Sequence, residues 1–168
     1  MQAGVFIKTN ADLSTILAST YLGGNRNDAA FALALNPTNN DVYIAGGTSS
    51  NNFPGTANGT VISATYNGAI DGFLSIVSND GGTLRKTSYL GTTGTEVLYG
   101  VQFDNLGFPY IMGTTTGDWP IINAAFSQAK GKQFIAKLKP DISAYVYSTV
   151  FGKGAPYPDI SPTAFLVD

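Results

Sequence analysis

The stretch VFIKTNADLSTILASTYLG, residues 5–23, occurs twice more along the chain in altered form. It returns as FLSIVSNDGGTLRKTSYLG at 73–91 and as FIAKLKPDISAYVYSTVFG at 134–152, and the three copies align without a gap. Each copy contains the same aspartate and closes on the same glycine: Asp12, Asp80, Asp141, Gly23, Gly91 and Gly152. Repetition at a near-fixed spacing is the sequence signature of a repeat architecture.

The sequence between these copies also repeats. FALALN (31–36) matches YGVQFD (99–104) and TAFLVD (163–168), and VYIAGGTSSNNFP (42–54) matches PYIMGTTTGDWP (109–120) with one deletion. The chain therefore divides into about two and a half repeat units. We expect the trailing half of a unit at 1–24, full units at 25–92 and 93–153, and the start of a further unit at 154–168.

Apolar and polar residues alternate within the repeated segments, and turn-forming residues separate them, which is typical of short β-strands. The pattern predicts strands at 5–9, 15–22, 30–36, 42–47, 73–78, 84–90, 98–104, 109–114, 134–139 and 144–151, with an eleventh in 163–168. Only INAAFSQAK (122–130) is a candidate for a helical turn.

Four short strands per repeat on a regular period predict an all-β protein, specifically a partial β-propeller built from four-stranded antiparallel blades. The alternative is a β-sandwich made of two similar halves. The alternation of the strands predicts that seven apolar side chains are buried between sheets: Phe31, Leu33, Tyr99, Val101, Phe134, Tyr147 and Phe151.

Composition excludes several classes of function. The chain has no His and no Cys, which removes imidazole bases, thiolate nucleophiles and the common zinc sites. Only 12% of residues are charged and the net charge is −2, so no basic surface is available for nucleic acid. No run of 18 apolar residues occurs, and we expect no membrane span.

The segment STYLGGNRNDAAFALALNPTNNDVYIAGGTSSNNFP (19–54), followed by DGFLSIVSNDGGTLRKTSYLG (71–91), resembles the bacterial repeat family called SBBP, for seven-bladed β-propeller. DISPTAFLVD (159–168) is similar to a segment of large surface proteins of gliding Bacteroidetes. The resemblance implies an extracellular or cell-surface location.

Carboxylates recur in the repeat: Asp28 and Glu96 are equivalent, and Asp159 lies one position away. Recurrence favours one structural acid per blade that caps loop amides over a catalytic pair. NPTNND (36–41) and SNDGG (78–82) resemble calcium loops in composition but lack the ligand spacing, so both are predicted to be turns. We expect no catalytic residue, metal or cofactor.

Trp119 is the sole tryptophan, and it takes the place of Phe53 in the other unit. A recurring aromatic residue before proline indicates a packed loop anchor. Stacking on a sugar is the alternative, and exposed rings of Trp119 and Tyr66 beside one groove would favour it. Trp119, Tyr66 and Phe53 are therefore the candidate ligand contacts.

The repeat architecture predicts a non-enzymatic structural or adhesion module, and the SBBP resemblance implies that it belongs to a bacterial surface or secreted protein. A carbohydrate-binding or carbohydrate-active propeller is the alternative, and surface glycans are its expected partners. Fewer than three blades would leave the outer blade faces open, because propellers close with about four to eight. We expect the remainder of a longer parent chain, or other copies of this chain, to cover those faces.

Overall fold

The computed structural model describes residues 1–162 and 164–168, and all regular structure in this part is β-strand. The ten strands are β1 (Gly4–Thr9), β2 (Ile16–Leu22), β3 (Asp28–Leu35), β4 (Val42–Thr48), β5 (Asp71–Val77), β6 (Leu84–Leu90), β7 (Glu96–Phe103), β8 (Pro109–Thr115), β9 (Gln133–Leu138) and β10 (Tyr145–Phe151). Each matches one of the first ten predicted ranges, so the all-β prediction is confirmed. No described residue is helical, and hence none belongs to a helix that could span a membrane.

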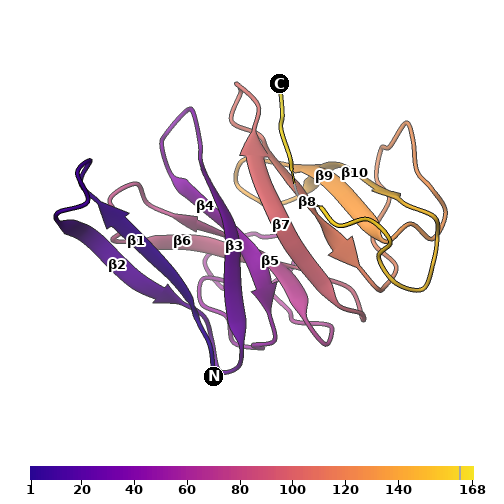
Figure 1. Ribbon diagram of the computed structural model, residues 1–168, viewed down its shortest axis with the longest axis horizontal. Helices are drawn as coiled ribbons and strands as arrows, with labels where there is room; N and C mark the ends of the chain where they lie inside the picture. Colours follow the sequence, from indigo (N-terminus) through magenta and orange to yellow (C-terminus); the bar gives the residue numbers. More distant parts are fainter. Residues whose placement is uncertain (163) are drawn as a thin grey trace.

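The strands form three antiparallel sheets in which neighbours along the chain are neighbours in space. These are the hairpin β1–β2, the four-stranded sheet β3–β6 and the four-stranded sheet β7–β10. Figure 1 shows them arranged in this order along the long axis of the molecule, with β3 and β7 side by side. Short turns connect β1 to β2, β3 to β4, β5 to β6, β7 to β8 and β9 to β10, as expected for antiparallel neighbours. Longer loops at 49–70 and 116–132 connect β4 to β5 and β8 to β9.

The strand register is the same in all three sheets. Equivalent residues of the repeat pair across equivalent strands, as in Val5 with Tyr21, Phe73 with Tyr89 and Phe134 with Val150. Both β3 and β7 carry a bulge at the same repeat position, between Ala30 and Ala32 and between Leu98 and Gly100. The repeat seen in the sequence is therefore a repeat of hydrogen-bonded structure.

Each sheet has a forward face, turned toward the next sheet along the chain, and a rear face on the opposite side. The forward side chains of the hairpin, including Phe6 and Leu22, form one apolar cluster with the rear side chains Val42, Ile44 and Phe73 of β3–β6. A second cluster joins the forward face of β3–β6 to the rear face of β7–β10. It contains Tyr43, Ala45, Leu74, Ile76, Leu90, Leu98, Val101, Ile111, Trp119, Phe134, Ala136, Leu138, Ile142 and Val150. Burial of these faces supplies the main stabilising energy of the fold.

The predicted burial is only partly correct. Val101 and Phe134 are buried, and Tyr147 and Phe151 are half-buried, whereas Phe31, Leu33 and Tyr99 are exposed. The last three were mispredicted for two physical reasons. Phe31 and Tyr99 are the extra residues of the two bulges, and their rings contact each other with centroids 5.7 Å apart. Leu33 lies on the rear face of β3, where the two-stranded hairpin does not reach.

Two local predictions are wrong. Residues 122–130 form no helical turn; Ile122 instead makes an isolated bridge with Ser148. Within 163–168, residue 163 lies outside the described residues and 164–168 are not a strand. Phe165 packs against Gly100 of β7, and without a neighbouring strand to pair with, this segment has no β-ladder to join.

Candidate functional site

Trp119 is a core residue. Its ring stacks on Phe134 of β9 with centroids 3.6 Å apart and planes at 6°, and the edge of Tyr145 closes the site. Its indole N–H donates to Ser148 Oγ at 2.8 Å. Only 5% of the residue is exposed, so no ring face remains free for a sugar. The predicted role as a packed loop anchor is confirmed.

Phe53 has the equivalent role in the preceding sheet. It packs on Phe73, the repeat equivalent of Phe134, with ring centroids 4.4 Å apart. Its backbone N–H donates to the hydroxyl of Tyr89, which in turn donates to the Ser50 carbonyl. The loop after β4 is thereby held against β5 and β6.

Tyr66 is half-buried, and its hydroxyl donates to the Ala69 carbonyl at 2.7 Å. Its ring meets the edge of Tyr89 at 6.0 Å, within the cluster behind β3–β6, whereas Trp119 lies in the other cluster. The structure does not bring Tyr66 and Trp119 together at one groove. The condition set for sugar stacking by these two rings is therefore not met.

The recurring acids hold the loops that lead into β3 and β7. Asp28 accepts from the Gly24 amide at 2.8 Å and from the hydroxyls of Thr48 and Ser50. Glu96 accepts from the Thr92 amide at 2.6 Å and from the hydroxyls of Thr92 and Thr115. The prediction that these acids cap loop amides is confirmed. Their oxygens are engaged in structural hydrogen bonds, which leaves no free pair for acid–base chemistry.

Exchanging Glu96 for glutamine is expected to lower the free energy of unfolding by about 1–2 kcal/mol, because one acceptor oxygen becomes a donor facing hydroxyls or an amide. Chemical denaturation monitored by circular dichroism measures the change. Asp118→Asn, on an exposed loop next to Trp119, is the matched control and should stay within about 0.5 kcal/mol of the unmodified protein. If the two variants had the same free energy of unfolding, the hydrogen bonds of Glu96 would not stabilise the fold as described.

The two loops that resemble calcium sites are turns held by their own side chains. Asn36 accepts from the Thr38 amide, and Asp80 accepts from the Gly82 amide and the Ser78 hydroxyl. Both are therefore Asx-type turns, as predicted. In the part of the chain that the structure describes, no three carboxylates converge to hold a metal ion.

Asp71, at the start of β5, is a functional candidate that the sequence predictions missed. Its side chain is buried; Oδ2 accepts from the Asn67 amide at 2.8 Å, and Oδ1 has no hydrogen-bond partner among the described residues. Burial, aided by the nearby charge of Glu96, raises the pKa of Asp71 to about 6. The sequence does hold a signal for this residue. The equivalent positions of the other two repeat copies hold Ala3 and Lys132, so the aspartate at 71 breaks the repeat.

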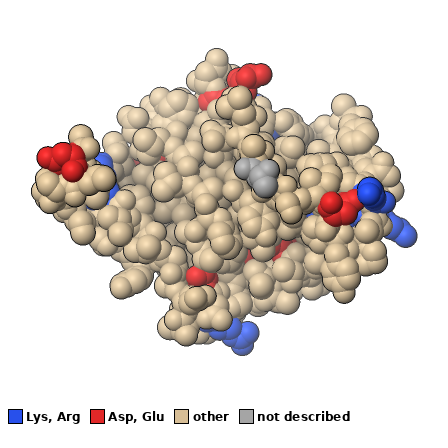
Figure 2. Space-filling view, viewed as in Figure 1, with Lys and Arg blue, Asp and Glu red and all other residues tan. Residues whose placement is uncertain are grey.

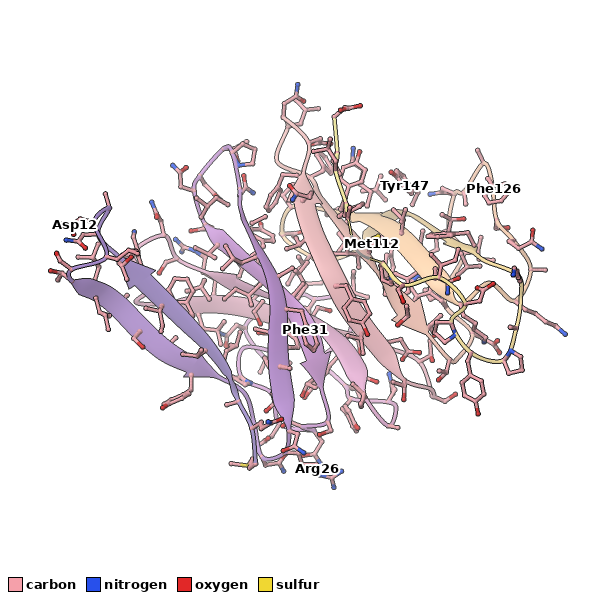
Figure 3. All side chains as sticks on the ribbon, viewed as in Figure 1. Asp12, Arg26, Phe31, Met112, Phe126 and Tyr147 are labelled. Carbon is pink, nitrogen blue, oxygen red and sulfur yellow. The ribbon has the colours of Figure 1, made fainter. Side chains whose placement is uncertain are left out.

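A hollow with a volume of about 640 Å³ lies between the ends of β3 and β7. Leu33, Leu35 and Phe103 supply apolar wall, and Asp104 and Asn105 are at its polar side. Charged side chains lie mainly at the margins of this side of the molecule in Figure 2, and the centre over β3 and β7 is almost uncharged. Phe31 lies within that centre (Figure 3).

This strip along β3 and β7 has the chemistry of a contact surface. Phe31, Leu33 and Leu35 are 54%, 59% and 55% exposed, a contiguous run on one strand. Exposed apolar patches are candidate sites for contact with another apolar surface. The strip offers no nucleophile or free carboxylate pair among its described residues.

Comparison with protein-family models gives no match, and no curated protein is significantly similar to the chain. The resemblance to the SBBP repeat stays a prediction.

Proposed function

We propose that the chain is a non-enzymatic structural or adhesion module whose four-stranded sheets are blades of a β-propeller. The observation that carries the proposal is the shared register of the three sheets, which stack forward face to rear face through equivalent positions. A β-sandwich of two halves would pack two like faces against each other, whereas a propeller repeats one forward-to-rear contact.

The repeat uses its polar side chains to hold itself together. Asp28 and Glu96 fix the loops into the inner strands, and Phe53 and Trp119 anchor the loops that follow β4 and β8. A rigid scaffold that presents loops and an apolar surface suits mechanical or adhesive work better than turnover. A secreted or cell-surface setting is proposed from the SBBP resemblance alone.

A glycan array and a panel of chromogenic glycosides test this proposal against the carbohydrate-active alternative. We expect no hydrolysis and no glycan bound more tightly than about 1 mM, since no exposed aromatic pair flanks a polar groove at the candidate residues. Saturable binding that Phe53→Ala and Tyr66→Ala abolish, in proteins shown by circular dichroism to be folded, would favour the alternative function instead.

A further inference from the structure

The rear face of the hairpin carries an open apolar surface made of Val5, Ile7 and Tyr21, here called the rear surface. These side chains are 55%, 53% and 81% exposed. Leu33 and Leu35 pair with Ile44 and Val42 and so belong to the rear face of the next sheet, outside this surface. None of the three residues of the rear surface is charged.

The repeat shows what normally covers these positions. Val5 and Tyr21 are equivalent to Phe73 and Tyr89, which are buried in the cluster with the hairpin. In the last sheet Val5 is equivalent to Phe134, which is buried in the cluster between the two four-stranded sheets. Each of these buried side chains is covered by the forward face of the preceding sheet.

The forward side of β7–β10 is the complementary surface, defined by Tyr110, Ile135, Tyr147 and Phe151 and here called the forward surface. All four are only half-buried. Tyr110, Ile135 and Phe151 are the equivalents of Tyr43, Leu74 and Leu90, each of which is buried by the next sheet. The C-terminal segment covers another part of this face, where Phe165 lies against Gly100.

The forward surface can be removed from water without burying an unpaired charge. Lys137, beside Tyr110, forms an ion pair with Asp104 at 2.8 Å, and its ammonium group lies over the rings of Phe108 and Tyr110. The hydrogen bond to Asp104 raises the pKa of Lys137. Both side chains of this pair are already largely shielded from water, at 18% and 10% exposed, so covering the forward surface removes little further solvation from them.

We propose that the rear surface of one copy of this chain binds the forward surface of a second copy, which extends the internal stacking across molecules. The inference rests on the proposed stacked-blade function, because it uses the same forward-to-rear contact. Such a contact joins two different surfaces and is heterologous, so it leaves one rear and one forward surface free to add further copies or to close a ring. A symmetric rear-to-rear dimer has no counterpart within the molecule.

Sedimentation velocity over about 1–100 µM, the range in which moderate protein contacts saturate, measures the association. The rear variant is Val5→Asp with Tyr21→Asp, and the forward variant is Tyr147→Asp. Leu106→Asp, at an exposed turn outside both surfaces, is the control, and circular dichroism verifies that every variant folds.

The unmodified protein and the control should sediment faster as concentration rises, and each surface variant alone should stay monomeric. An equimolar mixture of the two variants should form a one-to-one dimer and nothing larger, since only one pair of intact surfaces remains. A monomeric unmodified protein at 100 µM would overturn the self-association while leaving the blade architecture standing. A forward variant that still dimerises alone would show a rear-to-rear contact and overturn the proposed geometry.

Discussion

Trp119→Ala is expected to lower the free energy of unfolding by about 3–5 kcal/mol, the range for removing a large aromatic side chain from a packed core. The substitution removes the stack on Phe134 and the contact with Tyr145, and it leaves Ser148 Oγ without the indole donor. Equilibrium denaturation in guanidinium chloride, followed by circular dichroism, gives the change directly.

Two further variants separate packing from a general effect of aromatic loss. Trp119→Phe introduces the residue type of the equivalent Phe53, and it should recover most of the free energy of unfolding that Trp119→Ala loses. A cost of about 1–2 kcal/mol should remain, because the indole hydrogen bond is absent and the smaller ring leaves volume unfilled. Phe126→Ala removes a ring that is 65% exposed and should cost less than about 1 kcal/mol. If Trp119→Ala were no worse than Phe126→Ala, Trp119 would not be the anchor described above.

Asp71 is expected to lower stability by about 3 kcal/mol in total as the pH rises from about 3 to above 7, with about 2 kcal/mol of this change between pH 4 and pH 6. The pKa of this group is about 6 in the folded protein and 3.8 in its ordinary state, so the folded state binds more protons across this interval. The contribution is fully present below pH 3.8 and is lost as the pH rises through 6. Denaturation at several pH values between 4 and 8 measures this slope.

The pH dependence has an internal control of opposite sign. Asp71→Asn should abolish the decline and make the protein more stable than the unmodified chain at pH 7. The hydrogen bond from Ser78 lowers the pKa of Asp80, so ionised Asp80 stabilises the fold above about pH 4 and this contribution is lost as the pH falls further. Asp80→Asn should therefore change the slope only below about pH 4 and leave the decline above pH 4 in place. An Asp71→Asn protein with an unchanged slope above pH 4 would assign the titration to another group.

The repeat made the strands predictable from the sequence. Three ungapped copies of the 19-residue stretch place the turns of β1–β2, β5–β6 and β9–β10 at equivalent positions. The alternation within the repeated segments identifies the strands. The roles of Phe53, Trp119, Asp28 and Glu96 were also predictable, because a residue type that recurs at one repeat position serves the fold.

Burial was less predictable, because alternation divides a strand into two faces without showing which face another sheet covers. Leu33 and Val101 have the same alternation and the same repeat position, yet one is 59% exposed and the other 2%. The difference comes from the number of strands in the preceding sheet. The bulges that expose Phe31 and Tyr99 leave no mark in a period-two pattern either.

Asp71 shows the other limit of sequence reasoning. A single aspartate near the start of a strand normally indicates a turn or a solvated residue, and only the packing around it makes its burial visible. Comparison with Ala3 and Lys132 at the equivalent positions would have singled it out as a break in the repeat.

An experimental structure of the chain, by crystallography or cryo-electron microscopy, tests the propeller account most directly through two superpositions. The first places β1–β2 on β5–β6, and the second places β5–β6 on β9–β10. A propeller predicts that both are rotations about one common axis, by about 45–90°, as expected for a ring of four to eight blades. Rotation axes that do not coincide, or a rotation near 180° that packs like faces together, would contradict the account and favour a β-sandwich.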